Sequence, residues 1–466
     1  MIWGTSFSQA IFTSPSSRIH HEMIEYPLNC SNAHYLTHTC PDDYPSVFEP
    51  EESTTEICPD YFRWLHQDLK QWRSSGIIVD AIERGIPSET FRLVIVNGDA
   101  YVEKYRPAFQ TRDEFTIWGI LQLLRLYPGR VPDLDLLFFT GDRTWIIKRD
   151  YKGPTAPSLP PPVFHYCGEK AALDIVFPDW TFWGWAEVKI LPWEQMLRAI
   201  KQGREKIKWE EREPYAFWKG NPHVAADRVD LMKCNLSDKN DWNVRVYKQD
   251  WRKEIGHGFQ QSKLEDQCTH RYMNYENLFF LIVRELDYDF ESNGILNFAV
   301  VPWLSRYKIY IEGATWSRSL VPMRHFWPVH RKNKCRDLKF AVDWGNDHTR
   351  EGKREANISK RCWRYVYDYM FHMLNEYSKL LKFKPTIPPK AQRVCAETAA
   401  CSKKGLWKDF MVQSMVKSPS DKLPCTLPPP YEPQVIQASL DAKEKITKPV
   451  ETWETEYWKK LNNRKQ

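Results

Sequence analysis

The feature that most constrains the fold is the alternation of short apolar runs with segments of helical periodicity. The first two runs, at 91–96 and 100–105, flank the turn pair Asn97-Gly98 and therefore predict a β-hairpin. Later apolar runs bounded by turn residues predict buried strands: LDLLFF at 134–139, DIVF at 174–177 and YAFW at 215–218. Predicted helices separate and follow these runs: one that ends before Pro128, one at 193–209 and one at 223–234. This alternation favours an α/β architecture with mainly parallel sheets.

The helix before Pro128 has a predicted start as well as a predicted end. Thr111 and Glu114 have the spacing of a capping box, in which both side chains bond to backbone N–H groups of the first turn. Apolar residues then recur at helical spacing, at Ile117, Leu121 and Leu124.

Composition divides the chain into four parts. Residues 1–57 are rich in Ser, Thr, Pro and acidic side chains, which predicts an extended lead-in. Residues 58–214 and 215–390 each carry strand and helix signals and are predicted as two α/β halves. Residues 391–466 are rich in Lys and Pro and are predicted as a tail with a charged helix at its end.

The charge pattern does not indicate nucleic-acid binding. A net charge of +6 arises from 66 basic and 60 acidic residues, without a large block of one sign. The chain has 21 Trp, 22 Tyr and 23 Phe residues, and large aromatic cores account for most of them, although aromatic rings also stack on sugars.

The cysteine pattern favours disulfides over a zinc ribbon or a thioredoxin-like site, because no two of the eleven Cys have C-x-x-C spacing. Cys30, Cys40 and Cys58 crowd a segment that is too polar to build a core, which favours disulfide staples. An odd count leaves at least one thiol unpaired within the chain. Three glycosylation sequons are compatible with the secretory pathway but also arise by chance: Asn29, Asn235 and Asn357.

No targeting or membrane segment is predicted. Met1 to Phe12 lacks a basic region followed by a sustained apolar stretch, so no signal peptide is recognised. The longest apolar run, Leu278 to Val283, is far shorter than the roughly 20 residues of a membrane helix.

Asp142 closely follows the predicted strand at 134–139, at the edge where open α/β sheets bind ligands. A carboxylate there can accept the proton of an attacking hydroxyl group. On residue type alone, a turn Asp that caps the loop is the commoner interpretation.

Asp133 and Asp135 form an Asp-Leu-Asp triplet that imitates a metal-binding motif. Both side chains are expected on one face at the start of the strand. Because such triplets are common by chance, we favour a solvated strand edge and expect no metal.

The segment WKGNP, from Trp218 to Pro222, places Gly220 after a strand and before a helix. Backbone N–H groups in such a turn can meet phosphate oxygens, and Arg228 further along could neutralise a diphosphate. A plain turn is the alternative.

The run PDWTFWGWAEV holds four aromatic residues within six positions: Trp180, Phe182, Trp183 and Trp185. Neighbouring side chains point apart in either regular structure, so we expect some of these rings to line a cleft. Glu187, at the end of the run, is either part of that cleft or a solvated rim residue.

Residues 174–193, with EREPYAFWKGNP at 211–222, resemble the Rumi-like, capsule-associated glycosyltransferases of family 90, in particular their plant-type branch. The resemblance covers about nine tenths of the chain and implies two Rossmann-like domains that face each other across a cleft, the GT-B arrangement. It implies an inverting transfer of glucose or xylose from a UDP-sugar to a hydroxyl of a protein or glycan, without a metal or other cofactor. It also implies a membrane anchor and a Golgi or endoplasmic reticulum lumen location.

The resemblance assigns roles to particular residues. Asp142 matches the catalytic base, although this chain has Phe139, Thr140 and Gly141 where relatives have a more acidic run. The Gly220 turn, with Asn221 and Arg228, matches the binding site for the donor diphosphate. The stretch that holds the acceptor comprises Trp183, Gly184, Trp185 and Glu187.

The family pattern has two main breaks, and a lesser departure at SKRCWR before 365–377. CTHRY ends at Tyr272 and KIYIEG begins only at Lys308, so removal of 273–307 restores the uninterrupted family sequence. This segment suits translated intron; a genuine loop is the alternative. At Ser317-Arg318 the chain then omits a motif whose Ser and Lys grip the donor diphosphate in relatives and whose Cys is the expected partner of Cys268.

These breaks leave two hypotheses open. The chain is an impaired glycosyltransferase that lacks part of its donor site, or it is a non-catalytic remnant or the product of an incorrect gene model. A transcript that joins HRY directly to KIYIEG would show that the insertion is an error.

Overall fold

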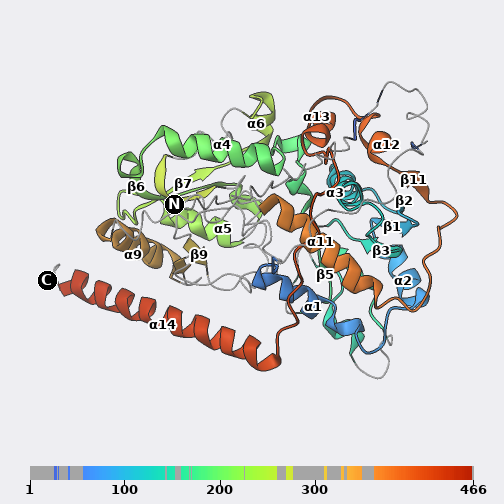
Figure 1. Ribbon diagram of the computed structural model, residues 1–466. Helices are drawn as coiled ribbons and strands as arrows, with labels where there is room; N and C mark the ends of the chain where they lie inside the picture. The colour runs from blue at the N-terminus through green and yellow to red at the C-terminus, as the bar shows by residue number, and fades with distance from the viewer. Residues whose placement is uncertain are drawn as a thin grey trace, which may run out of the picture.

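The structure is a computed structural model, and it describes the following residues: 26–28, 30, 40–41, 56–141, 144–152, 159–166, 168, 171–224, 226–259, 269–275, 309–311, 327–329, 333–348 and 362–463. Its described helices and strands form an α/β fold, as the sequence predicted. Figure 1 shows two groups of strands, each accompanied by helices, with α11 (Cys362–Ser378) between them.

The larger sheet has six strands in the order β11-β2-β1-β3-β4-β5. Their bounds are β1 Phe91–Val96, β2 Asp99–Lys104, β3 Leu134–Phe138, β4 Val163–His165, β5 Ile175–Val176 and β11 Gln392–Val394. Strands β3, β4 and β5 are parallel, whereas β1 is antiparallel to both β2 and β3, and β11 is antiparallel to β2. The sheet is therefore mixed rather than mainly parallel, because the two hairpin strands take part in three antiparallel pairings.

The hairpin prediction is confirmed. Asn97 has φ 52° and Gly98 has φ 83°, the pair of left-handed conformations that a two-residue type I′ turn requires. The ladder runs without interruption from Phe91 opposite Lys104 to Val96 opposite Asp99.

Helix α3 (Arg112–Leu126) packs against the six-stranded sheet, and almost all of its residues are buried. The helix starts where the sequence predicted, but the capping-box prediction is wrong, since its first turn has no side-chain cap. The Thr111 hydroxyl instead donates to Oε2 of Glu187 at 2.8 Å. Glu114 pairs with Lys104 at 2.6 Å, so tertiary partners have replaced the local ones.

Other helical segments surround this sheet: α1 (Trp64–Asp68), α2 (Val79–Gly85), α12 (Ala396–Ala400), α13 (Gly405–Gln413) and short 3₁₀ turns. Helix α11 buries Tyr367, Tyr369 and Leu374 in the same core, although it lies within the predicted second half, 215–390. The core of this sheet therefore draws residues from both sides of the 215–350 region.

The smaller sheet has three parallel strands in the order β7-β6-β8. They are β6 (Glu213–Gly220), β7 (Val244–Lys248) and β8 (His270–Tyr275). Strands β9 (Ile309–Ile311) and β10 (Trp327–Val329) form a separate parallel pair. Trp218, Trp327 and Phe340 contribute to the buried core of this region.

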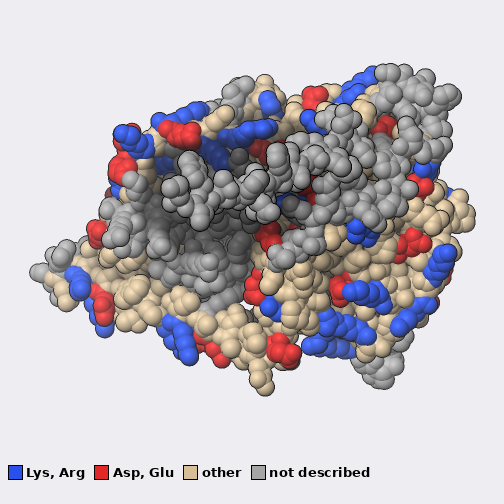
Figure 2. Space-filling view, viewed as in Figure 1, with Lys and Arg blue, Asp and Glu red and all other residues tan. Residues whose placement is uncertain are grey.

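The helices of this region are α5 (Ala226–Leu231), α6 (Trp251–Gly256) and α9 (Lys334–Asp347). Helix α4 (Trp193–Lys206) precedes them in the chain and buries Trp193 and Met196 in the core of the larger sheet. Arg198 and Lys206 are exposed on α4. In the view of Figure 2, Lys and Arg atoms follow the upper-left edge that α4 occupies in Figure 1, interspersed with acidic atoms.

Strand β8 continues three residues into the segment that the sequence predicted as an insertion. Met273, Asn274 and Tyr275 pair with Phe217, Trp218 and Lys219 of β6. The remainder of that segment, 276–307, lies outside the described residues, as do Cys268 and the break at Ser317-Arg318.

Three disulfides join the first 60 residues to residues far along the chain: Cys30–Cys401, Cys40–Cys395 and Cys58–Cys425. The sequence prediction of disulfide staples in the first 60 residues is therefore confirmed. A fourth disulfide, Cys234–Cys335, lies in the smaller region. The side chains of the other three cysteines lie outside the described part of the chain: Cys167, Cys268 and Cys362.

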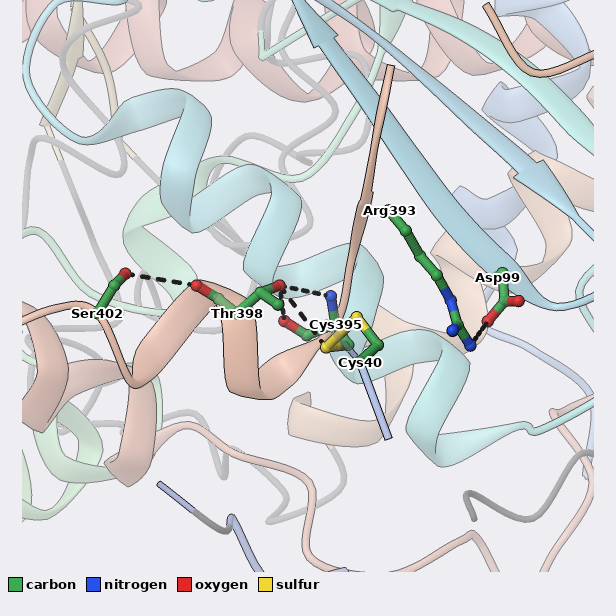
Figure 3. Close-up of a disulfide and its surroundings, with 6 residues drawn as sticks. All are labelled: Cys40, Asp99, Arg393, Cys395, Thr398 and Ser402. Carbon is green, nitrogen blue, oxygen red and sulfur yellow. Dashed lines mark hydrogen bonds and ion pairs between the residues drawn. A yellow bond between two sulfur atoms is a disulfide. The ribbon is translucent and has the colours of Figure 1, made fainter. Parts of the chain in front are cut away.

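Residues 391–425 do not form a tail, which corrects the sequence expectation for the start of 391–466. Strand β11 forms the edge of the six-stranded sheet, where Arg393 makes an ion pair with Asp99 at 2.8 Å (Figure 3). Cys395 follows directly and joins Cys40, while its backbone N–H donates to the Thr398 hydroxyl at 2.9 Å. Pairing with β2 and the disulfides bring this lysine-rich segment into the fold.

The C-terminal residues form the predicted charged helix, α14 (Pro433–Asn463), which crosses the lower left of Figure 1 and ends beside α9. Trp453 stacks on Trp344, and the hydroxyl of Tyr457 donates to Asp343. Among the described helices, none combines the length and apolar character needed to cross a bilayer.

Candidate functional site

The candidate site begins where β3 ends, at Phe139, Thr140 and Gly141. Asp142 and Arg143 lie outside the described residues, but the chain is described on both sides of them. All five residues of β3 are buried, so the strand delivers this loop from the centre of the sheet. The described residues on either side of 142–143 show which contacts hold the loop in place.

The first limb of the loop, residues 139–141, is hydrogen-bonded to three buried side chains. The N–H of Thr140 donates to the Thr90 hydroxyl at 3.0 Å, and the Thr140 carbonyl accepts from Nη1 of Arg112 at 3.1 Å. The Gly141 carbonyl is 3.0 Å from Nε2 of His165, at the end of β4. Because a carbonyl oxygen only accepts, Nε2 of His165 carries the proton in this contact.

The second limb of the loop, residues 144–146, is hydrogen-bonded to Asp174, which precedes β5. The N–H groups of Trp145 and Ile146 donate to the two carboxylate oxygens of Asp174 at 2.9 and 3.1 Å. The rings of Phe139 and Trp145 stack with centroids 4.7 Å apart, which joins the two limbs. The positions on either side of 142–143 are therefore fixed by side chains from separate segments.

Arg112 connects this loop to the tryptophan-rich stretch. Its side chain is buried, and its guanidinium lies over Trp180 at 4.7 Å and Trp185 at 5.9 Å. The same group donates to the Thr140 carbonyl. Arg112 was not among the site residues predicted from the sequence; the available signal was a cation in the first turn of the helix, where the helix dipole disfavours positive charge.

The prediction that some rings of the tryptophan-rich stretch line a cleft is wrong. Trp180, Phe182, Trp183 and Trp185 are each at most 2% exposed and belong to one buried cluster. In a regular helix or strand these neighbouring side chains would point apart. Residues 180–182 instead form a 3₁₀ turn, and Gly184 has φ +122°. This irregular backbone turns neighbouring side chains into the same core.

Two indole N–H groups of this stretch have buried partners. Nε1 of Trp183 donates to the hydroxyl of Tyr367 at 2.9 Å, and Nε1 of Trp185 donates to Gln110 at 2.8 Å. Gly184 faces Phe410 so closely that an added Cβ would lie 2.9 Å from its ring. The stretch is therefore fixed by packing on both sides.

Glu187 is the member of the predicted acceptor stretch that retains substantial exposure, since it is only partly buried. Its Oε2 accepts from the Thr111 hydroxyl at the start of α3. Glu187 is therefore oriented by a specific bond rather than being a freely solvated rim residue.

The predicted solvated edge at Asp133 and Asp135 is corrected for Asp135. This carboxylate is fully buried and accepts two bonds from Arg92, at 2.7 and 2.5 Å. Asp133 accepts from the N–H of Asn97 at 2.8 Å. The two acidic groups thus have separate structural partners, an ion pair within the sheet and a bond to the hairpin turn.

Buried carboxyl groups surround the loop. Burial raises the pKa of Glu89, directly before Thr90, to about 8, against a weaker opposing bond from Ser88. Burial also raises the pKa of Asp174, and nearby His165 opposes that shift. Both groups are buried away from solvent.

The predicted donor-binding residues lie at the carboxyl end of β6. Gly220 ends that strand, and its carbonyl accepts from the N–H of Gln249 at 2.8 Å. The side chain of Asn221 accepts from the N–H of His223 at 3.0 Å, which caps a 3₁₀ turn at Pro222–Val224. Arg228 lies in α5, and its side chain is outside the described part.

The helix predicted at 223–234 is divided into a 3₁₀ turn, the six-residue α5 and a further 3₁₀ turn at Met232–Cys234. The GT-B arrangement implied by the resemblance would bring Asp142 and Arg228 to one cleft, but Asp142 and the side chain of Arg228 lie outside the described residues.

A cavity of about 260 Å³ lies at the other end of the six-stranded sheet. It is lined by the hairpin turn at Asn97 and Gly98, by the end of α3 and by Arg393 and Cys395 of the edge strand. Because Ile95 pairs with Leu134 at the start of β3, this cavity is remote from the loop that follows β3. It is therefore not part of the candidate site.

Comparison with known proteins supports a family assignment. The family model described as Glycosyl transferase family 90 matches residues 53–454. The chain belongs to glycosyltransferase family 90. The match includes the loop after β3, the tryptophan-rich stretch and the carboxyl end of β6.

Curated relatives of this family 90 chain are O-glucosyltransferases. The chain is 24% identical over 289 residues to an O-glucosyltransferase rumi homolog of Aedes aegypti, a match that covers 57% of this chain and 66% of the relative. It is 25% identical over 248 residues to O-glucosyltransferase rumi of Drosophila melanogaster, covering 50% and 56%. A homolog of Anopheles gambiae is 22% identical over 344 residues, covering 68% and 78%. The chain thus spans less than two thirds of the length of the first two relatives.

Proposed function

We propose that this chain is built for inverting transfer of glucose or xylose from a UDP-sugar to a hydroxyl group of a protein or glycan, without a metal ion. The observation that carries the proposal is the loop after β3. Side chains from four separate segments hold the residues on either side of Asp142: Thr90, Arg112, His165 and Asp174. Such a supporting shell is what a general base needs to keep a fixed position.

In the proposed reaction, the Asp142 carboxylate accepts the proton of the acceptor hydroxyl as its oxygen attacks the anomeric carbon. The bond from that carbon to the UDP oxygen breaks on the opposite side, so the configuration inverts. A positioned general base typically contributes about 10² to 10⁴ in rate.

The donor is proposed to bind at the carboxyl end of β6. Backbone N–H groups at Gly220 and Asn221 would face the diphosphate, and Arg228 would offset its charge. In relatives, a motif with a Ser and a Lys also binds the donor diphosphate, and this chain lacks that motif after Ser317. The loss of one such donor typically costs about 3 kcal/mol, or about a hundredfold in rate, so we propose that the chain is impaired.

The acceptor is proposed to bind along the tryptophan-rich stretch. Since Trp183 and Trp185 are buried, we assign them and Gly184 to holding the backbone, and Glu187 to the acceptor contact. Arg112 would keep this stretch at a constant distance from the Asp142 loop. The two sheets would face each other across the cleft in the GT-B arrangement.

We propose the lumen of the endoplasmic reticulum or Golgi as the working compartment. Four disulfides require an oxidising environment during folding.

The alternative is a non-catalytic remnant or the product of an incorrect gene model. The observation that favours it is the sequence break, in which 273–307 interrupts the family pattern and the donor motif is absent.

The test compares the chain with a restored form that lacks 273–307 and carries the donor motif. Release of UDP from UDP-glucose and UDP-xylose is measured with candidate acceptors, with and without EDTA, and the anomeric configuration of the product is read by NMR. We expect transfer by the restored form, little by the chain as given, and a loss of about 10² to 10⁴ in the Asp142→Asn variant of the restored form. Absence of transfer by both forms would refute the proposed function and favour the remnant.

A further inference from the structure

The Asp142 loop is supported by a buried acid and a buried imidazole that the proposed chemistry does not use directly. Asp174 is 5% exposed as a residue and its side chain is fully buried, as is that of His165. Oδ1 of Asp174 lies 4.0 Å from Nδ1 of His165. Each of the two groups holds the backbone of a different limb of the loop.

The division of contacts is specific. His165 reaches the carbonyl of Gly141, which is bonded directly to Asp142. Asp174 accepts from the N–H groups of Trp145 and Ile146, which follow the loop. Burial of a carboxylate lowers the stability of the fold unless hydrogen bonds satisfy its oxygens. Here the second limb of the loop supplies those hydrogen bonds.

We propose that Asp174 and His165 are a pair of positioning residues that fix both limbs of the loop carrying Asp142. This inference rests on the proposed function for its kinetic consequence, but its structural part is independent of activity. The pair acts through the backbone: Nε2–H of His165 donates to the Gly141 carbonyl, and the Asp174 carboxylate accepts from the N–H groups of Trp145 and Ile146. Packing alone would not need these directed polar contacts.

The structural part is tested by hydrogen exchange in the full chain, read by mass spectrometry on peptides spanning residues 144–147. Asp174→Ala should speed exchange of the Trp145 and Ile146 amides by about tenfold to a hundredfold, because both lose their acceptor. Asp174→Asn keeps the shape of the side chain but leaves one carbonyl oxygen as acceptor, so it should speed exchange less than Asp174→Ala does. The Asn variant also replaces the Ala variant in the experiment if the latter does not fold.

Asp368→Asn is the matched control. Asp368 is also a buried acid, but it accepts from Tyr127 and from the N–H of Cys425. Acceleration at 144–147 in the Asp174 variants and not in Asp368→Asn supports the proposal. Unchanged exchange in the Asp174 variants, or equal acceleration in the control, overturns it.

The kinetic part uses whichever form of the chain releases UDP from a UDP-sugar. His165→Met removes the donor to Gly141 and should lower kcat by about a hundredfold with little change in the KM for UDP-sugar, as expected for a base misplaced by about 1 Å. His165→Gln retains an N–H donor and should recover much of that loss. A full kcat in His165→Met overturns the positioning role, as does a Gln variant no better than Met.

The two failures are distinguishable. Absence of UDP release by the chain and by its restored form refutes the proposed function, and the exchange experiment then decides the positioning inference by itself.

Discussion

The six-stranded sheet is completed by residues from both ends of the chain, whereas the three-stranded sheet is built from the single stretch 213–275. Strand β11 at 392–394 supplies an edge of the larger sheet, and three disulfides tie residues 30–58 to 395–425. The smaller region has one described disulfide, Cys234–Cys335, that closes a shorter segment. The larger sheet therefore depends on contacts between residues that are remote in sequence.

Two ion pairs of the two regions differ in exposure. In the larger sheet, Arg92 pairs with Asp135, whose side chain is fully buried. The smaller region also buries ionisable groups such as Lys334 and Asp337, but its Arg245 pairs with Asp241, which is 41% exposed. Loss of a partner lowers the free energy of unfolding strongly for a buried charge and only weakly for an exposed pair. Matched substitutions therefore test whether the two ion pairs differ in this way.

The largest expected effect is loss of the buried ion pair in the larger sheet. Arg92→Leu leaves Asp135 buried without its guanidinium and should cost about 3–5 kcal/mol of local stability. The matched variant Arg245→Leu should cost only about 0–1 kcal/mol. A chain with two regions need not unfold in one step, so stability is read from hydrogen exchange of amides in each sheet. Equal losses would remove the distinction between the regions.

The second prediction concerns the disulfides. Replacement of Cys58 and Cys425 by Ser should cost about 2–5 kcal/mol and loosen amides of the six-stranded sheet. Replacement of Cys234 and Cys335 should loosen amides of the three-stranded sheet and leave β1 and β3 protected. Loss of protection in both sheets from either double variant would show that the regions unfold together.

The third prediction uses two helical glycines. At Gly119 an added Cβ would lie 2.3–2.5 Å from the buried ring of Trp183, so Gly119→Ala should cost about 1–3 kcal/mol. At Gly256, the last residue of α6, an added Cβ has no neighbour within 4 Å. Gly256→Ala should therefore be neutral or stabilise by up to about 1 kcal/mol. A thermal unfolding midpoint that falls equally in both variants would contradict the packing of Trp183.

The last comparison is a difference in the sign of the pH dependence. Burial raises the pKa of Glu89 from an ordinary value of 4.5 to about 8, so the folded chain keeps a proton that the unfolded chain loses. Stability of the larger sheet should therefore fall as pH rises through this window, by at most about 1.4 kcal/mol per pH unit, and Glu89→Gln should flatten that slope.

The smaller region should show the opposite sign. Arg245 lowers the pKa of Asp241 below its ordinary value of 3.8, so this pair stabilises the fold at higher pH and loses its contribution as pH falls through the lowered pKa. Urea titrations at several pH values, read by exchange in each sheet, measure both slopes. A Glu89→Gln variant with the slope of the unmodified chain would show that Glu89 is not the group that titrates.

Part of this structure was predictable from short stretches of sequence. The hairpin follows from Asn97-Gly98, because few residues adopt two consecutive left-handed conformations. The buried strand at 134–138 follows from its apolar run, and family membership follows from motifs that are long and contiguous. The general position of the candidate loop was predictable for the same reason, since it follows that strand.

Tertiary structure alone decided the partners of the side chains. Thr111 bonds to Glu187 instead of capping its own helix, Arg112 reaches Thr140 and Trp180, and Asp174 holds Trp145 and Ile146. The four aromatic residues at 180–185 share one core because an irregular backbone turns them there. Local backbone preference is set by a few neighbouring residues, and so the sequence determined it; burial and bonding partners depend on residues up to hundreds of positions away, which only the folded chain brings together.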